Sequence, residues 1–186
     1  MADESRRPSA GPTSIRNLTH DQIAELVEEL GQPKFRTKQI EEWLWTKNAQ
    51  TFDEMTNLPA KLRSELSARF STGSATEIVR QESVDGSRKY LLGFDDGVSV
   101  ECVGMPSGPK LSVCASTQAG CGMGCAFCAT GKAGLTRSLK AAEIYEQVRH
   151  AGDDFGQRVT SVVLMGQGEP FANYDETLKA LRLLNS

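Results

Sequence analysis

The sequence predicts an α/β fold in which a small all-α accessory domain and a short antiparallel β meander precede the start of a parallel α/β barrel. Three observations predict it. Apolar residues keep helical spacing over residues 17–70, turn signals separate short strand-like segments over 76–105, and strand and helix patterns alternate after residue 109. The 186 residues, 39% of them hydrophobic, have the composition of a soluble globular protein. No apolar run approaches the ~18 residues of a membrane span, which favours a cytoplasmic protein without membrane contact.

The first segment is polar and contains Pro8 and Pro12, so residues 1–16 are predicted to form a disordered tail. Thr19 and Gln22 have the spacing of a capping box, in which each side chain binds the other residue's backbone N–H. An amphipathic helix is therefore expected from this point.

Two further helices complete a helical domain predicted over residues 17–75. One begins near Thr37, and the other follows Pro59, since proline is well tolerated at the first helical position. Leu62 and Leu66 lie one helical turn apart and indicate a buried face.

An antiparallel meander is predicted over residues 76–105, because Asp85-Gly86 and Asp96-Gly97 are strong hairpin turn signals. The expected strands are residues 76–84, 88–94 and 98–105. A run of proline and glycine over 106–109 then predicts a break between the meander and the rest of the chain.

The remaining residues, 106–186, are predicted to form the N-terminal part of the barrel. Their expected elements are a strand over 111–117, a loop over 120–134, a helix over 139–151, a strand over 160–166 and a helix over 174–185. The second strand is continuously apolar, as in parallel sheets that are buried on both faces. Two strand–helix units cannot cover both faces of such a sheet, so we expect the chain to be a fragment of a longer protein.

Three of the five cysteines form the pattern Cys121-x3-Cys125-x2-Cys128, in a loop that three glycines make flexible. An odd number of cysteines in one short stretch is not a disulfide framework. Three thiolates can hold an iron–sulfur cluster with one iron left open to an outside ligand. Alternatively, Cys114 completes a four-cysteine zinc site, although the spacing fits paired zinc knuckles poorly.

Residues 110–140 carry four basic side chains and no acidic one, although the whole chain has a net charge of −3. The four are Lys110, Lys132, Arg137 and Lys140. An anionic partner at this loop and a plain surface loop without carboxylates both fit this distribution.

The segment CASTQAGCGMGCAFCATGKAGLTR, residues 114–137, resembles the cluster loop of radical S-adenosylmethionine (radical SAM) enzymes. Its context resembles more narrowly the RlmN/Cfr family of RNA adenine methyltransferases. Three further stretches agree with that family: residues 35–45, 57–63 and 165–180. The resemblance covers nearly the whole chain after the tail and implies a partial (β/α)6 barrel.

The resemblance also implies the cofactor residues. Cys121, Cys125 and Cys128 match the ligands of one [4Fe-4S] cluster per chain, and Gly168 with Glu169 matches the pair that binds S-adenosylmethionine. By pattern alone, this pair is the turn that follows a strand.

Two further roles follow from the resemblance. Glu101 matches the family's proton acceptor, and Cys114 matches a resolving cysteine that forms a transient disulfide with a methyl-carrying cysteine beyond this chain. By pattern alone, Glu101 is a solvated strand carboxylate and Cys114 a small buried strand residue. Cys102 matches no role and is predicted to lie in the core.

The resemblance implies methylation of adenine C2 in 23S rRNA, at the peptidyl-transferase centre, and in tRNA, 3′ of the anticodon. It also implies an electron donor such as flavodoxin or ferredoxin and a monomeric full-length protein. We expect this fragment to be inactive alone. The alternatives are a Cfr-like adenine C8 methyltransferase and a non-catalytic zinc-binding RNA module. Candidate RNA contacts in the helical domain are Lys34, Arg36, Lys38, Lys61, Arg63, Trp43 and Trp45. The charged residues fit a solvated face equally well, and Trp43 fits the core of the domain.

Overall fold

The computed structural model describes residues 13–73 and 75–185. The chain divides into two compact units, residues 1–74 and residues 75–186, and the two are described separately. Among the described residues, no helix is both long and apolar enough to cross a membrane.

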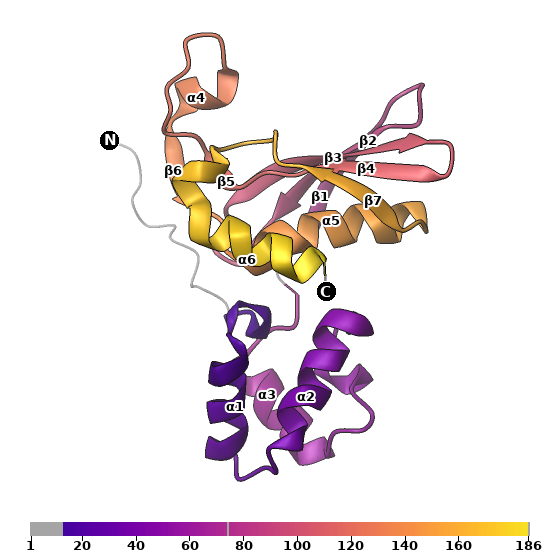
Figure 1. The fold of residues 1–186 in the computed structure, drawn as a ribbon, viewed down its shortest axis with the longest axis vertical. Helices are drawn as coiled ribbons and strands as arrows, with labels where there is room; N and C mark the ends of the chain where they lie inside the picture. The colour runs from indigo at the N-terminus through magenta and orange to yellow at the C-terminus, as the bar shows by residue number, and fades with distance from the viewer. Residues whose placement is uncertain (1–12, 74, 186) are drawn as a thin grey trace. The chain divides into compact units, whose positions relative to one another are not determined.

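The described residues of the first unit form a bundle of three α-helices connected by short helical turns (Figure 1). Thr19 and Gln22 form the predicted capping box, with N···O distances of 2.8 Å and 3.3 Å between each backbone N–H and the other side chain. The elements are η1 (Ile15–Asn17), α1 (His20–Glu29), α2 (Phe35–Glu41), the π-helical η2 (Glu42–Thr46), η3 (Phe52–Glu54) and α3 (Ala60–Arg69).

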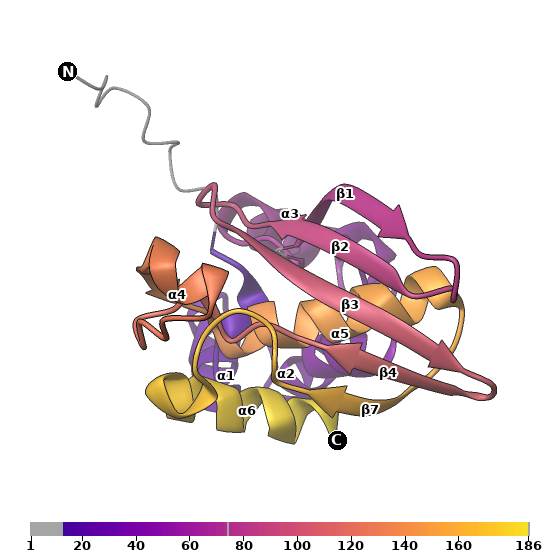
Figure 2. The ribbon, with the colours of Figure 1, turned by 90° about the horizontal axis from the view of Figure 1, so that it is seen from above.

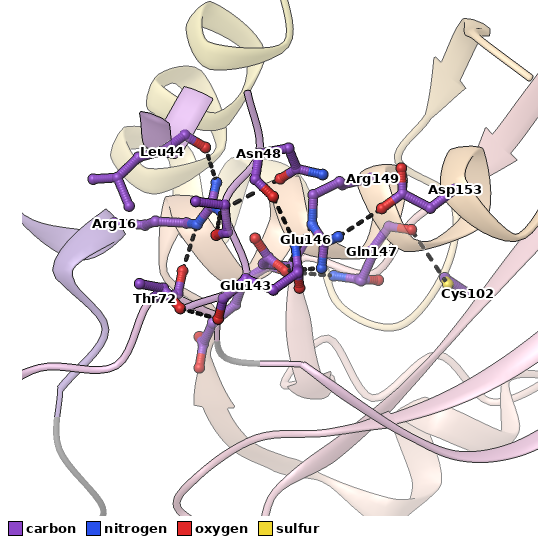
Figure 3. A network of polar contacts seen from close by, with 12 residues as sticks. Arg16, Leu44, Asn48, Thr72, Cys102, Glu143, Glu146, Gln147, Arg149 and Asp153 are labelled. Carbon is purple, nitrogen blue, oxygen red and sulfur yellow. Dashed lines mark hydrogen bonds and ion pairs between the residues drawn. The ribbon is translucent and has the colours of Figure 1, made fainter. Parts of the chain in front are cut away.

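The helical unit includes residues that precede the predicted residue 17. Residues 1–12 of the expected tail lie outside the described residues, but Ile15 and Arg16 are buried in the helical unit. The Ile15 N–H donates to the Ser71 carbonyl at 2.9 Å, which holds Ile15 beside the end of α3. The Arg16 guanidinium donates to the backbone carbonyls of Thr72, Leu44 and Ala49 and thereby joins three segments (Figure 3).

The described residues of the second unit contain a five-stranded sheet of order β1-β2-β3-β4-β7, in which only the β4–β7 pair is parallel. Two helices, α5 and α6, lie on one side of this sheet (Figures 1 and 2). The mixed α/β fold class is confirmed. The strands are β1 (Thr76–Glu82), β2 (Arg88–Gly93), β3 (Ser99–Ser107), β4 (Lys110–Cys114) and β7 (Val159–Val163), and the helices are α5 (Ala141–Phe155) and α6 (Tyr174–Leu184).

A small second sheet pairs β5 (Gln118–Gly120) with β6 (Leu135–Ser138). The cysteine loop and the short helix α4 (Ala129–Ala133) connect these two strands, and η4 (Pro170–Asn173) precedes α6. We refer to β5, the loop, α4 and β6 together as the cysteine hairpin.

The meander and the barrel strands belong to one sheet, so the break predicted at residues 106–109 is wrong. β3 continues to Ser107, and Pro106 lies opposite Leu111 in the β3–β4 pair. Gly108, at φ +57°, forms the turn of a hairpin because glycine reaches this conformation without strain.

The two faces of the sheet differ in what covers them. Tyr90, Leu92, Cys102 and Val113 are buried against Val148 and Ala151 of α5 in one apolar cluster. Residues between them in sequence point to the other face and are partly exposed, as Glu101 and Cys114 show. In the described sheet β7 is the outer strand, and Val163 is 37% exposed.

Candidate cofactor site

The three clustered cysteines belong to the cysteine hairpin, in the loop that follows the end of β5 at Gly120. Figure 1 shows this loop with α4 between β5 and β6. The Cys121 N–H donates to the Gly134 carbonyl at 2.9 Å, which closes the base of the loop. The Cys128 N–H donates to the Cys125 carbonyl at 3.0 Å, which keeps these two residues within one turn.

Two glycines allow the backbone to approach itself closely in this loop. A Cβ atom on Gly120 would lie 2.0 Å from the Gly134 carbonyl oxygen, and Gly120 has a φ of +74°. A Cβ atom on Gly131 would lie 3.1 Å from the Cys125 nitrogen. Glycine is therefore a steric requirement of the fold at Gly120, whereas a side chain at Gly131 would need the Cys125 backbone to move by a few tenths of an ångström.

The three thiols differ in exposure. Cys125 is exposed, whereas Cys121 and Cys128 are half-buried, and each of the five cysteines, all within the described residues, is a free thiol. The backbone N–H of Gly131 lowers the pKa of Cys128 by hydrogen bonding to its sulfur, which favours the metal-binding thiolate. No group of three His, Cys, Asp or Glu side chains in residues 13–73 and 75–185 is placed to hold a metal ion. The donor set fits an iron–sulfur centre in its chemistry, but the thiols are not gathered around one point.

The predicted pair Gly168 and Glu169 lies beside the cysteine hairpin. β4 and β7 are parallel, so the segments that follow them, 115–118 and 166–169, leave the sheet at the same end, where the carboxyl ends of both strands lie. The Gly166 N–H donates to the Ala115 carbonyl at 3.2 Å, and the Thr117 N–H donates to the Gln167 carbonyl at 2.9 Å. The structure thus brings the expected cofactor pair next to the stem of the expected cluster loop.

Side chains continue this pairing where the backbone ladder ends. The Gln167 N–H donates to the Ser116 hydroxyl at 2.8 Å, and the Glu169 N–H donates to Gln118 Oε1 at 3.0 Å. Glu169 is half-buried, and its Oε1 accepts the Phe171 N–H at 3.1 Å. Sequence reasoning missed Ser116 and Gln118; the signal was a run of polar residues directly after an apolar strand.

Glu101 and Cys114 share the face of the sheet that points away from α5. Cys114 lies opposite Val103 on the neighbouring strand, so Glu101 is its diagonal neighbour, a relation that places Cα atoms roughly 7–8 Å apart. Glu101 forms an ion pair with Lys89 at 3.0 Å, and both side chains are nearly half exposed. Both residues lie near the end of the sheet from which the cysteine loop departs.

Cys102 lies on the opposite, covered face and is 1% exposed, as predicted. Burial raises the pKa of its thiol to about 12, and its sulfur lies 3.9 Å from the Gln147 carbonyl oxygen of α5 (Figure 3). A protonated, buried thiol of this kind is a packing residue.

Asp96 and Glu143 neutralise Arg137, one of the four cations expected around the loop. Its guanidinium binds Asp96 at 2.6 Å and both carboxylate oxygens of Glu143 at 2.8 Å. These contacts join β6 to the turn before β3 and to the first turn of α5. Arg137 is therefore occupied in holding the hairpin, whereas the remaining cations of the stretch are exposed: Lys110, Lys132 and Lys140.

The predicted RNA contacts of the helical unit fall into three groups. Arg36 and Arg63 donate to backbone carbonyls at 2.7 Å and 2.6 Å, so their charges are tied to the fold. Trp43 and Trp45 pack, partly buried, against the core of the unit. The exposed cations are Lys34, Lys38 and Lys61.

Two family models match the chain. Residues 13–71 match the ribosomal RNA large subunit methyltransferase N-terminal domain, and residues 115–186 match the radical SAM superfamily. The chain is 45% identical over 181 residues to the probable dual-specificity RNA methyltransferase RlmN of Staphylococcus epidermidis, and 43% identical over 182 residues to that of Rhodopirellula baltica. These alignments cover 96% of this chain and 50% and 49% of the relatives, so the chain spans about half the length of the curated relatives it matches.

A solved structure is also similar. The crystal structure of a radical SAM methyltransferase from Sphaerobacter thermophilus matches with a TM-score of 0.85 and 37% identity, over 94% of this chain and 52% of that one. Both units of the chain therefore have counterparts in proteins of one family.

Proposed function

Because the chain belongs to the family of radical SAM methyltransferases that includes these RNA-modifying relatives, we propose that it forms part of an enzyme that methylates C2 of adenine in RNA. The proposed substrates are 23S rRNA and tRNA, as the resemblance implies. One observation carries the proposal: the stem of a three-cysteine hairpin is hydrogen bonded to the segment that holds Gly168 and Glu169.

The cofactor residues are proposed on this geometry. Cys121, Cys125 and Cys128 would hold a [4Fe-4S] cluster, and the lowering of the Cys128 pKa by the Gly131 N–H supports thiolate ligation there. Glu169 would bind the ammonium group of S-adenosylmethionine, and Gly168 would leave room for close approach of the ligand. When bound, these cofactors supply one-electron radical chemistry that no protein side chain provides, with electrons from a donor such as flavodoxin or ferredoxin.

Two residues of the open sheet face would act on the RNA. Glu101 would accept the proton that leaves the adenine carbon, and its ion pair with Lys89 holds a carboxylate on that face. Cys114 would release the product by forming a transient disulfide with the methyl-carrying cysteine that the resemblance places further along the protein. Cys114 is half-buried and a free thiol, as an attacking cysteine must be.

RNA would contact the exposed lysines of both units. Phosphate contacts of this kind give affinity that falls with salt and carry no sequence information. The proposed location is the cytoplasm, where both RNA substrates are found, and the proposed full-length protein is a monomer.

The experiment that tests the function is removal of the encoding gene from its host, followed by mass spectrometry of nucleosides from rRNA and tRNA. We expect loss of 2-methyladenosine, which the wild-type gene restores and a gene with Cys128→Ser does not. Restoration by Cys102→Ala, which removes a cysteine outside the proposed site, is the matched control. Loss of 8-methyladenosine would indicate methylation at C8 instead of C2. An unchanged set of methylated nucleosides would contradict the proposed methyltransferase activity.

A further inference from the structure

We propose that Gln118 is a positioning residue that fixes the Glu169 backbone relative to the cysteine hairpin. The inference rests on the proposed cofactor site and adds a residue to it that touches neither a thiol nor a carboxylate. It concerns how two separate parts of that site are held in one arrangement.

The side-chain amide of Gln118 is used at both ends. Its Oε1 accepts the N–H of Glu169 at 3.0 Å, and its Nε2 donates to the Ser138 hydroxyl at 3.2 Å. Ser138 is the last residue of β6, the returning strand of the cysteine hairpin. One side chain therefore connects both strands of the hairpin stem with the Glu169 segment.

Burial makes this connection specific. Gln118 is 2% exposed, so water does not replace either hydrogen bond when the amide is removed. A buried amide that has both partners holds them at defined distances, because an unpaired polar group in this position is costly.

Gly168 confirms how closely the two segments approach. A Cβ atom on Gly168 would lie 2.5 Å from Gln118 Cβ and 2.7 Å from the Gln118 nitrogen, and its φ is +96°. Gly168 therefore packs directly on Gln118, and the requirement for glycine here has a second cause besides room for a ligand. Asn173, also buried, ties the start of α6 to the same stem through the carbonyls of Thr117 and Leu139, both at 2.8 Å.

The test compares the full chain with the variant Gln118→Met, which keeps the shape of the side chain and removes both hydrogen bonds. We expect the Glu169 amide to exchange with solvent at least about fivefold faster in this variant, because its acceptor is lost. The Gly166 amide, which donates to a backbone carbonyl in the same segment, should be unchanged. Gln118→Glu keeps an acceptor oxygen and should restore slow exchange at Glu169.

A second readout is the electron paramagnetic resonance spectrum of the reduced, reconstituted cluster. Gln118→Met should leave the spectrum without S-adenosylmethionine unchanged. It should raise, by a factor of at least about five, the S-adenosylmethionine concentration that produces half of the spectral shift. Gln147→Met is the matched control, because Gln147 is equally buried and, among the described residues, its amide hydrogen bonds to the backbone of Ser116 and of α5 and not to the Glu169 segment. It should reduce stability without moving this concentration.

The outcomes separate the two proposals. Equal exchange of the Glu169 amide in wild type and Gln118→Met would overturn the positioning role. If the wild-type cluster responds to S-adenosylmethionine, the same half-shift concentration in Gln118→Met would overturn it too. A wild-type cluster that ignores S-adenosylmethionine would overturn the proposed cofactor site in this chain, while the exchange of the Glu169 amide would still decide the role of Gln118.

Discussion

Replacing Gly120 with alanine should open the base of the cysteine hairpin, and Gly124→Ala provides a matched control. Both glycines have a positive φ, of +74° and +62°. They differ in the room available for a side chain. A Cβ atom on Gly120 would lie 2.0 Å from the Gly134 carbonyl oxygen, whereas a Cβ atom on Gly124 would have no neighbour within 4 Å.

The two variants share one cost and differ in another. An alanine in the left-handed region costs about 1–2 kcal/mol at either position. At Gly120 the carbonyl of Gly134 must also move by about 1 Å or more, since contacts below 3.0 Å essentially never occur. That movement breaks the 2.9 Å hydrogen bond from the Cys121 N–H, which adds about 1 kcal/mol to a steric cost of similar size. The difference between the variants is therefore about 2 kcal/mol, or roughly thirtyfold in the equilibrium for local opening.

The assay is hydrogen exchange at the Cys121 amide, measured by nuclear magnetic resonance in wild type and both variants. The fluorescence of Trp43 and Trp45 provides a control, because both tryptophans belong to the unit formed by residues 1–74 and should be unaffected. Equal exchange of the Cys121 amide in the two variants would refute the steric argument.

Two further predictions concern charge and thiol chemistry. Arg137→Met should destabilise the second unit by about 2 kcal/mol, because the substitution leaves the carboxylate of Glu143 without its ion pair. The cost is smaller than for a fully buried pair because Arg137 is 27% exposed. Urea unfolding followed by the amide signals of residues 75–185 measures the loss, and an unchanged midpoint would contradict the pairing. Arg137 also lowers the pKa of Asp96 below 3.8, so this stabilisation is present above that pH and is lost as acid protonates Asp96; wild type should lose more stability below pH 3.8 than the variant does. Iodoacetamide should modify Cys128 at lower pH than an ordinary thiol. Cys102 should stay unmodified in the folded chain, because its pKa of about 12 and its burial both prevent reaction. Peptide mass spectrometry across a pH series measures the modification of both cysteines, and early labelling of Cys102 would contradict its burial.

The sequence predicted what depends on neighbouring residues. The capping box of Thr19 and Gln22 needs contacts across three residues only, and the turns at Gly86 and Gly97 need a single backbone conformation. The spacing of the three cysteines is equally local, which is why a cluster motif is visible in the sequence. The motif does not determine where the thiols point, and the loop backbone alone does not gather them.

What escaped prediction depends on contacts between distant segments. β5 has three residues and β6 has four, and they pair across the whole cysteine loop, so neither shows a strand pattern of useful length. The join of meander and barrel was missed because Gly108 and Pro109 form a hairpin turn between paired strands instead of a break, and Pro106 lies within β3. The role of Gln118 appears only when β4 and β7 lie side by side.

The most direct test of the account is anaerobic reconstitution of the full chain with iron and sulfide, followed by electron paramagnetic resonance with and without S-adenosylmethionine. The account predicts the signal of a reduced [4Fe-4S] cluster that shifts when the cofactor is added and that is lost in Cys128→Ser. A folded chain that binds one zinc ion and no cluster would contradict the account.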